Sequence, residues 1–390
     1  MIHLEQAQDI VMREAVMTGN GRVMLPHANG RVLAEDIFSD INMPPFDKSA
    51  VDGFACRKDD LGSELTVMET IAAGTGPQVP IMPGTCSKIM TGAMVPPGAD
   101  CIFMVEDSVE VAPGRVRFTG TGEPVNICFK GEDIKAGEKV LSGGTLIRPQ
   151  EIAVLATAGI TRPLVATQPR VAVITTGDEL VHPSVKPTGP MIRNSNSYQL
   201  EAQIARAGGI PSNMGIVEDK RRSILEALLK AIPQHHIILL TGGVSMGDFD
   251  YVPDILKSAG ISILFRKIAI QPGKPTVFGK YEDKMIFGLP GNPVSSFVLF
   301  EMLVRPLIRK MMGWQGTLPV LRLPLGADFT RRKTERKALV PVAIRHGEIF
   351  PVDYHGSAHI NAYAGADGII VMEIGIGEMK KGTVTDVRQV

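Results

Sequence analysis

The chain has no net charge, no long apolar run and few aromatic residues. Lys and Arg together number 41, as do Asp and Glu, so the formal net charge is zero. A nucleic-acid partner held by bulk electrostatics is therefore not expected. The longest apolar stretch, residues 297–304, contains Glu301 and is too short to span a bilayer, so no membrane segment is expected. The N-terminal residues carry acids and no cleavage-site signature, so no secretory signal is expected.

Cysteine is also scarce and scattered. The four cysteines contain no C-x-x-C pair and lie far apart in the sequence, at Cys56, Cys86, Cys101 and Cys128. This pattern disfavours a zinc or iron–sulfur framework. It predicts reduced thiols in the core of a cytoplasmic protein.

Length and composition indicate several domains. The 390 residues exceed one typical domain, and 44% of them are hydrophobic, enough for sizeable cores. Residues 4–15 repeat apolar positions at helical spacing, with Gly19 as a plausible C-cap. Short strand-like runs between residues 42 and 139, divided by glycine and proline, predict a small β domain. Residues 321–390 have the same character and predict a second β module.

The central part, residues 170–313, alternates buried strands with helices. Three apolar runs, at residues 171–176, 237–241 and 285–289, each end in a glycine-containing loop. Helices are predicted over residues 197–207, from Asp219 onward, and over residues 292–311. Strand and helix in this alternating order predict a doubly wound α/β layer with a parallel sheet.

The loops after these runs predict a ligand site. In an open parallel sheet, ligands bind beyond the carboxyl ends of the strands, where these loops would converge. Glycine lets backbone N–H groups approach an anion, and a helix N-terminus favours negative charge. The same loops carry the carboxylates Asp178, Glu179, Asp248 and Asp250. Anion-binding backbone beside carboxylates indicates a phosphorylated ligand together with a divalent metal.

Seven strings in fixed order carry a family resemblance. They are MPPFDKSAVDGFA, IMTGAMVPPGAD, GEDI, TTGDEL, TGGVSMGDFDY, PGKPT and LPGNPVSS, between Met43 and Ser296. Together they resemble the MoeA family of molybdopterin molybdenumtransferases, of which the C-terminal domain of gephyrin is a eukaryotic member. One glycine loop alone would be weak support, whereas seven ordered strings over nearly the whole chain are specific.

The resemblance implies an elongated, multidomain α/β plus β protein that forms homodimers. It implies a split linker domain at residues 18–40 and 138–166 and a small β domain at 41–137. A MogA-like α/β domain would comprise residues 1–17 and 167–316, and a C-terminal β-barrel residues 317–390. The active cleft would lie between the α/β domain of one subunit and β domains of its partner.

The resemblance also implies an activity. Such enzymes insert molybdate into adenylylated molybdopterin and release AMP in a Mg²⁺-dependent step. Molybdopterin adenylyltransferase and cofactor-accepting molybdoenzymes are possible partners. The implied metal ligands are Glu179, Asp219 and Asp250. The other implied catalytic residues are Asp52, Thr91, Asp133, Lys267 and Lys274. The implied cofactor-binding residues are Gly242, Gly243, Ser245, Pro290, Asn292, Pro293, Ser295 and Ser357.

Each of these residues also has a local structural alternative. Asp52 and Asp133 are typical turn aspartates, and Thr91 is an ordinary strand-end threonine. Asp219 is a good N-cap for the helix that follows it. Lys267 and Lys274 suit an oxyanion but could equally be solvated lysines at a strand edge. The chain departs from the family pattern at Gln271, where members commonly have a lysine, which leaves the affinity for the oxyanion open.

Two other functions compete with transfer of molybdenum. Molybdopterin adenylyltransferases of the MogA type share the central α/β fold, but they do not need residues 43–139 or 321–390. A non-catalytic pterin carrier or scaffold would keep the fold without turnover, as the receptor-anchoring role of gephyrin illustrates. The carboxylate set favours an enzyme over a carrier.

Overall fold

The central unit is a six-stranded sheet whose inner strands are buried on both faces. The computed structural model describes residues 1–243, 252–354 and 356–390. The strand order is β16-β13-β17-β21-β20-β18, in which the first four strands run parallel and the last two pair antiparallel. Their bounds are β13 Arg170–Thr176, β16 Ile210–Val217, β17 Ile237–Thr241, β18 Ser262–Phe265, β20 Val277–Tyr281 and β21 Lys284–Leu289.

Alternating side chains of these strands point into two separate hydrophobic cores, one on each face of the sheet. In β13, Val171 and Val173 face one core, whereas Ala172 and Ile174 face the other. The continuous apolar runs of the sequence arise because helices cover both faces of a parallel sheet. The first core contains helices α1 Leu4–Arg13, α3 Asn196–Ala207, α6 Pro293–Leu299 and α7 Arg305–Met311. The second contains α4 Arg221–Ala231 and α5 Val252–Ser258. The predicted doubly wound layer is confirmed.

Two predicted helix ends are wrong. The first helix ends at Arg13, with Glu14 and not Gly19 as its C-cap residue. The helix predicted to begin at Lys220, with Asp219 as its N-cap, begins one residue later at Arg221, and its N-cap is Lys220. Asp219 therefore does not cap this helix. Its backbone N–H donates to the Asp178 carboxylate at 3.1 Å.

The long helix predicted over residues 292–311 changes its winding midway. α6 is followed by a π-helical segment, η5 Phe300–Val304, and then by α7. A π turn inserts one extra residue into an α-helix. The first residue after Phe300 is Glu301, whose side chain is fully buried between α3 and the C-terminal strand.

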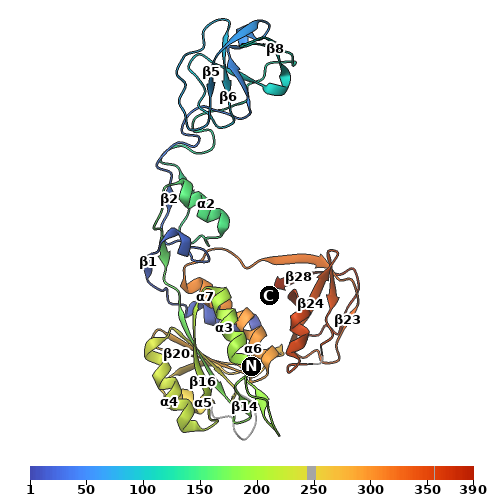
Figure 1. Ribbon diagram of the computed structural model, residues 1–390. Helices are drawn as coiled ribbons and strands as arrows, with labels where there is room; N and C mark the ends of the chain where they lie inside the picture. The colour runs from blue at the N-terminus through green and yellow to red at the C-terminus, as the bar shows by residue number, and fades with distance from the viewer. Residues whose placement is uncertain (244–251, 355) are drawn as a thin grey trace.

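The chain crosses a slender linker twice on its way to and from a small β unit. In the linker, β1 Asn20–Arg22 pairs with β12 Leu164–Ala166, and β2 Ile37–Phe38 pairs with β11 Lys139–Leu141. The helix α2 Pro149–Thr157 packs in the same core. Figure 1 shows the linker between the α/β unit and the small β unit, which lies at the far end of the elongated molecule. The short pair β3 Lys48–Ser49 and β10 Ile127–Cys128 belongs to that far end.

The small β unit is built on a sheet of order β7-β4-β6-β5-β9-β8. The bounds are β4 Gly53–Cys56, β5 Glu64–Ile71, β6 Thr85–Ile89, β7 Cys101–Met104, β8 Ser108–Ala112 and β9 Arg115–Phe118. Cys56 and Cys101 are opposite each other across β4 and β7, with their sulfurs 3.3 Å apart. All four cysteines are free thiols, and three of them are buried, whereas Cys128 is half-buried.

The C-terminal unit is a β structure that curls back on itself. Its sheet follows the path β19-β24-β26-β28-β22, and β25 pairs with β24. A single bridge from Leu325 to Ile349 joins the end of β22 to β25, so the strands close as a barrel. The bounds are β19 Ile270–Gln271, β22 Val320–Pro324, β24 Lys337–Arg345, β25 Glu348–Pro351, β26 Gly368–Met372 and β28 Val384–Gln389.

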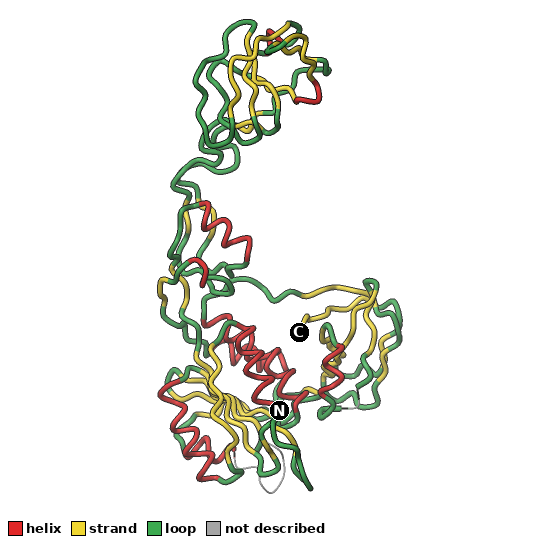
Figure 2. Tube along the Cα trace, in the orientation of Figure 1, coloured by secondary structure: helices red, strands yellow, loops and turns green. Residues whose placement is uncertain are grey.

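Smaller elements complete the chain. β14 Leu180–Val181 pairs with β15 Ile192–Arg193, and β23 Phe329–Thr330 pairs with β27 Glu378–Met379. A 3₁₀ turn at Ile360–Gly365 interrupts the strands of the C-terminal unit. None of the helices that the structure describes has both the length and the apolar character needed to cross a bilayer. Figure 2 shows strands in all three units, most of the helices around the central sheet and the helix α2 in the linker.

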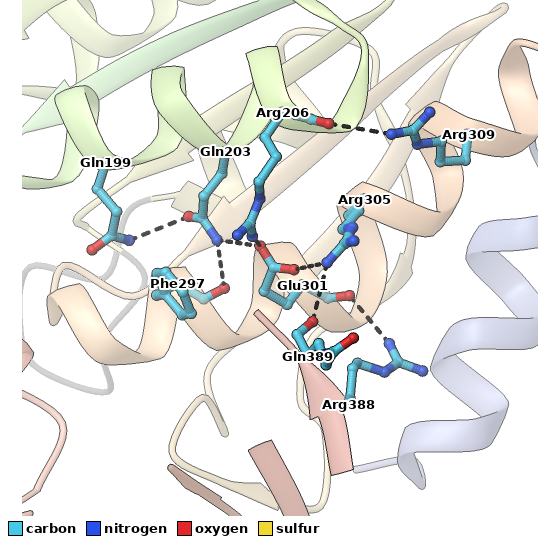
Figure 3. A network of polar contacts seen from close by, with 9 residues as sticks. All are labelled: Gln199, Gln203, Arg206, Phe297, Glu301, Arg305, Arg309, Arg388 and Gln389. Carbon is cyan, nitrogen blue, oxygen red and sulfur yellow. Dashed lines mark hydrogen bonds and ion pairs between the residues drawn. The ribbon is translucent and has the colours of Figure 1, made fainter. Parts of the chain in front are cut away.

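A buried ion-pair network joins the C-terminal strand to the α/β unit (Figure 3). The Glu301 carboxylate accepts hydrogen bonds from Gln203 at 2.7 Å, Arg206 at 2.6 Å and Arg305 at 2.8 Å. The Glu301 carbonyl accepts another from Arg388 of β28 at 3.2 Å. Because Glu301 is fully buried, removing its charge would leave guanidinium groups without a counter-charge.

We therefore expect Glu301→Ala to lower the free energy of unfolding by about 3–5 kcal/mol, the usual cost of breaking a buried ion pair on one side. Denaturant unfolding followed by the fluorescence of Trp314, the only tryptophan, measures this directly. Glu226→Ala is the matched control, because Glu226 pairs with Arg222 on the exposed face of α4 and should matter little. Equal effects of both substitutions would contradict a structural role of the Glu301 network.

Candidate functional site

One cavity lies where β13, β17 and β21 end. The paired residues Thr175, Thr241 and Leu289 are in register across these strands, so the three loops leave the sheet side by side. The cavity has a volume of about 530 Å³. Its lining comes from all three loops, from the segment before α3 and from the C-terminal unit through Ala358 and Ile360. The predicted position of the ligand site is the position of this cavity.

Buried polar atoms without partners gather in the lining. Four side-chain oxygens from neutral residues are buried and have no hydrogen-bond partner within the described residues: Oγ1 of Thr175, Thr176 and Thr241, and Oδ1 of Asn196. Leaving a buried polar group unpaired costs about 1–3 kcal/mol, so such groups are usually satisfied. A polar ligand in the cavity would supply the missing partners.

Two predicted metal ligands, Glu179 and Asp219, line this cavity together. Asp219 has its Oδ1 buried without a partner within the described part of the chain. Burial, and then the neighbouring carboxylates Asp178 and Glu179, raise the pKa of Asp219 above its ordinary value. A divalent cation would relieve this repulsion, and Mg²⁺ takes one or two carboxylates together with phosphate oxygens. The third predicted ligand, Asp250, lies outside the described residues, which contain no cluster of three metal-binding side chains.

The glycine loop after β17 is tighter than expected. Gly242 has a φ of 95°, and a Cβ there would lie 2.4 Å from the Thr176 carbonyl oxygen, so only glycine fits. Gly242 and Gly243 line the cavity, as predicted. However, the Gly242 N–H donates to the Leu289 carbonyl at 3.2 Å, so it is not free for an anion. The expectation that Gly242 offers its N–H is wrong. Ser245 and Asp248 fall outside the described residues.

The turn before α6 also lines the cavity, through Pro290, Asn292 and Pro293. The first two residues of α6 offer no free N–H to an anion, because Pro293 has no N–H and the Val294 N–H donates to the Ser357 carbonyl at 3.1 Å. Ser357 instead accepts a hydrogen bond from Asn292 Nδ2 at 2.9 Å, which ties the C-terminal unit to this turn. Ser295 is buried inside α6 and is not part of the lining.

The predicted cationic residues lie outside the lining. Lys274 precedes Pro275, which does line the cavity, whereas Lys267 is further away along the chain. Both side chains are half-buried. Gln271 is exposed on β19 and lines a different cavity, beside Arg332 and Lys333. The role of these positions toward an oxyanion stays a prediction.

The remaining predicted residues, Asp52, Thr91 and Asp133, belong to the small β unit and its edge. The Thr91 N–H and hydroxyl both donate to Asp52 Oδ1, at 2.6 and 2.8 Å. These two hydrogen bonds lower the pKa of Asp52, so the carboxylate is ionised at neutral pH. Asp133 lies in a separate turn, where its N–H donates to the Met43 carbonyl. Within one chain this group is at the opposite end of the molecule from the cavity (Figure 1).

Several lining residues escaped the sequence analysis. They are the strand-end threonines Thr175, Thr176 and Thr241, and the run Arg193, Asn194, Ser195 and Asn196 at the start of α3. Two signals could have revealed them. Both VITTG and LLTGG end an apolar run in threonine, which is unusual inside a buried strand, and RNSNS is a dense polar string at a helix start.

The fold and the matches to family models define a multidomain protein with a probable molybdopterin-binding domain. Residues 172–310 match the model described as a probable molybdopterin binding domain. Residues 2–159 match the MoeA N-terminal region (domain I and II), and residues 322–390 match the MoeA C-terminal region (domain IV). The chain therefore belongs to the MoeA family and functions in molybdenum cofactor biosynthesis.

Similar proteins cover the whole chain. The molybdopterin molybdenumtransferase of Staphylococcus epidermidis is 36% identical over 400 residues, which is 99% of this chain and 95% of the relative. That of Staphylococcus aureus is 34% identical over 98% of this chain and 94% of its own length. The crystal structure of the molybdopterin biosynthesis MoeA protein from Pyrococcus horikoshii is 28% identical, covers 100% of both chains and gives a TM-score of 0.85.

The raised pKa of Asp219 gives a test of the cavity that needs no ligand. A raised pKa means that the ionised carboxylate opposes folding, and this cost develops as pH rises from the ordinary value of 3.8 through the raised pKa. Without divalent cations, Asp219→Asn should therefore raise the melting temperature at neutral pH, and the gain should shrink as the pH falls toward 3.8.

Thermal unfolding across this pH range measures the gain. Asp254→Asn, on the exposed face of α5, serves as the control and should give no comparable pH-dependent gain. A loss of stability in Asp219→Asn at neutral pH would mean that the carboxylate has a structural partner.

Proposed function

We propose that this chain is a molybdopterin molybdenumtransferase, which inserts molybdate into adenylylated molybdopterin and releases AMP. The observation that carries the proposal is the convergence of Glu179, Asp219 and four orphaned neutral oxygens on one cavity at the carboxyl edge of the sheet. A ligand with a phosphoanhydride and a polar heterocycle would satisfy both parts of this lining. The names of the relatives support the same assignment.

The carboxylates would act on the anhydride end of the substrate. Glu179 and Asp219, with Asp250 as the third candidate, would hold Mg²⁺, which would offset the negative charge of the phosphate oxygens. The hydroxyls of Thr175, Thr176 and Thr241 can donate hydrogen bonds to those oxygens. Asn196 donates its Nδ2 hydrogen to the Gly291 carbonyl at 2.7 Å, which leaves Oδ1 to accept from an N–H of the pterin. The chain thus positions the substrate and stabilises charge.

We further propose a cytoplasmic homodimer whose clefts are shared between subunits. Thr91 holds Asp52 ionised, and the small β unit to which both belong lies at the opposite end of the molecule from the α/β unit (Figure 1). A partner subunit arranged antiparallel, with two-fold symmetry, would bring its small β unit to the cavity of the other chain. The linker core draws its residues from positions 23–37 and 140–165, which supports the proposed linker domain at residues 18–40 and 138–166.

The first test concerns the carboxylates. Glu179→Gln removes one metal-binding charge without changing the size of the side chain, so Mg²⁺-dependent AMP release should fall by at least about a hundredfold, as for loss of a transition-state contact. The measurement is AMP release from adenylylated molybdopterin with molybdate, at several Mg²⁺ concentrations.

Glu218→Gln is the matched control for this test. Glu218 is the residue before Asp219, pairs with the exposed Lys220 and does not line the cavity. The activity of the Glu218→Gln variant should therefore stay at the parental level. Net transfer of AMP from ATP onto molybdopterin would instead indicate an adenylyltransferase. Tight binding of the substrate without turnover in the parent protein would indicate a carrier.

The second test concerns the dimer. Asp52→Asn and Glu179→Gln should each be inactive alone, because each damages every cleft. When the two variants are co-expressed at equal levels, about half of the dimers are mixed, and each mixed dimer has one intact cleft. About a quarter of the parental activity should therefore return if the cleft is shared by two chains.

Co-expression of Glu179→Gln with Asp219→Asn is the control for this complementation. Both substitutions lie in the same unit, so every mixed dimer would have two damaged clefts and activity should not return. Absence of recovery with Asp52→Asn and Glu179→Gln, in dimers verified as mixed, would refute a shared cleft.

A further inference from the structure

A second cavity lies where the linker, α7 and the connection to the C-terminal barrel meet. Its volume is about 510 Å³. The linker contributes residues 142–146 and Arg148, α7 contributes Arg305 and Arg309, and the connection contributes residues 314–319. The cavity is separate from the one at the sheet edge, since the two share no lining residue.

The charge of this lining is entirely positive. Arg148, Arg305 and Arg309 line the cavity, and within the described part of the chain no Asp or Glu does. Asp36 accepts the Gly143 N–H nearby but is paired with Lys139. The lining also offers the hydroxyls of Ser142, Thr145 and Thr317.

The arginines behind the cavity do not have enough carboxylates. The single carboxylate of Glu301 pairs with Arg206 at 2.6 Å and with Arg305 at 2.8 Å, whereas Arg388 donates to the Glu301 backbone carbonyl and Arg309 to the Arg206 carbonyl (Figure 3). Arg148 is paired with Glu151 at 2.7 Å. Of the three arginines that line the cavity, Arg305 shares the Glu301 carboxylate with Arg206, and Arg309 has no carboxylate partner within the described residues. Burial, and then the nearby Arg305, lower the pKa of Arg309, as expected for a cation without a counter-charge.

Arg309 is the lining arginine that has both a buried unpaired donor and no carboxylate partner within the described residues. It is only 9% exposed, and its Nη1 is buried without a hydrogen-bond partner within the described residues. Its Nη2 donates to the Arg206 carbonyl at 3.2 Å, and its guanidinium lies 5.7 Å from the centre of the Trp314 ring. Arg305 also has a buried donor, Nε, without an acceptor in the described chain. Arg305 and Arg309 thus each bring an unpaired guanidinium donor to one cavity wall, and an anion is the acceptor that would satisfy such donors and also offset their charge.

We propose that this cavity binds a phosphate group, either free or at the end of a small phosphorylated molecule. Arginine forks match the oxygens of phosphate in pairs, whereas a neutral ligand would leave the charge excess uncompensated. The cavity is larger than one phosphate, so a phosphate monoester also fits. Because the lining comes from the linker, α7 and the connection, the bound anion would hold these three segments together.

Trp314 makes the site directly measurable, because it lines the cavity and is the only tryptophan. The full-length protein is titrated with inorganic phosphate, and separately with ribose 5-phosphate, while Trp314 fluorescence is recorded. Potassium chloride at matched ionic strength gives the background. A saturable change with either phosphate compound, absent with chloride, is expected. Tighter binding of ribose 5-phosphate would identify a monoester as the ligand, and equal or tighter binding of inorganic phosphate would identify the free anion.

Two variants link the signal to the arginines. Arg309→Met keeps the packing volume but removes the orphaned donor, so the apparent affinity should fall at least about tenfold. Arg148→Lys keeps a positive charge beside Glu151 but loses the paired N–H donors of the guanidinium group. The Arg148 side chain is exposed, so this substitution should not disturb the hydrophobic core. It should weaken binding several-fold. Arg222→Lys is the matched control, since Arg222 also pairs with a carboxylate but on exposed α4.

Two outcomes would overturn the proposal. One is a response to chloride equal to the response to phosphate, which would mean general screening of charge. The other is unchanged phosphate affinity in both Arg309→Met and Arg148→Lys, which would place the binding elsewhere. Neither outcome bears on AMP release at the first cavity, because none of these arginines lines it.

Discussion

The register of three parallel strands is the constraint on which the rest of the molecule depends. β13, β17 and β21 pair without a shift over their last residues, so Thr175, Thr241 and Leu289 lie at one level and the three strands end within one residue of it. Their side chains are buried on both faces, and a slip by one residue would exchange the two cores. The three loops must therefore open at the same edge. The cavity and its orphaned hydroxyls are a consequence of this shared ending.

Local patterns predicted the elements well. The apolar runs, the helix over residues 197–207 and the position of the cavity at the strand ends follow from periodicity and from the rule for parallel sheets. Helix ends were less predictable, because Asp219 and Gly19 have the residue types of caps while tertiary contacts place the ends elsewhere. The seven motif strings indicated the family, which composition and periodicity could not.

Long-range contacts were beyond the reach of the sequence. The hydrogen bond from the Gly242 N–H to the Leu289 carbonyl depends on how two loops meet after folding. Thr91 and Asp52 are 39 residues apart and form their hydrogen bonds only because β4 and β6 pair side by side. The excess of arginines around Glu301 arises from α3, α7 and β28, whose proximity no local pattern encodes.

The π-helical segment has a consequence for the geometry of α7. An α-helix turns by about 100° per residue, so the extra residue accommodated at Phe300–Val304 rotates everything after it by that angle. Arg305 and Arg309 are four residues apart and share one face of α7. With regular winding, that face would point in another direction, while Ser296 and Val298 would keep their places against the sheet. Deleting one residue from this segment would therefore rotate the face of α7 that carries Arg305 and Arg309. The apolar packing of α6, which precedes the segment, would stay in place.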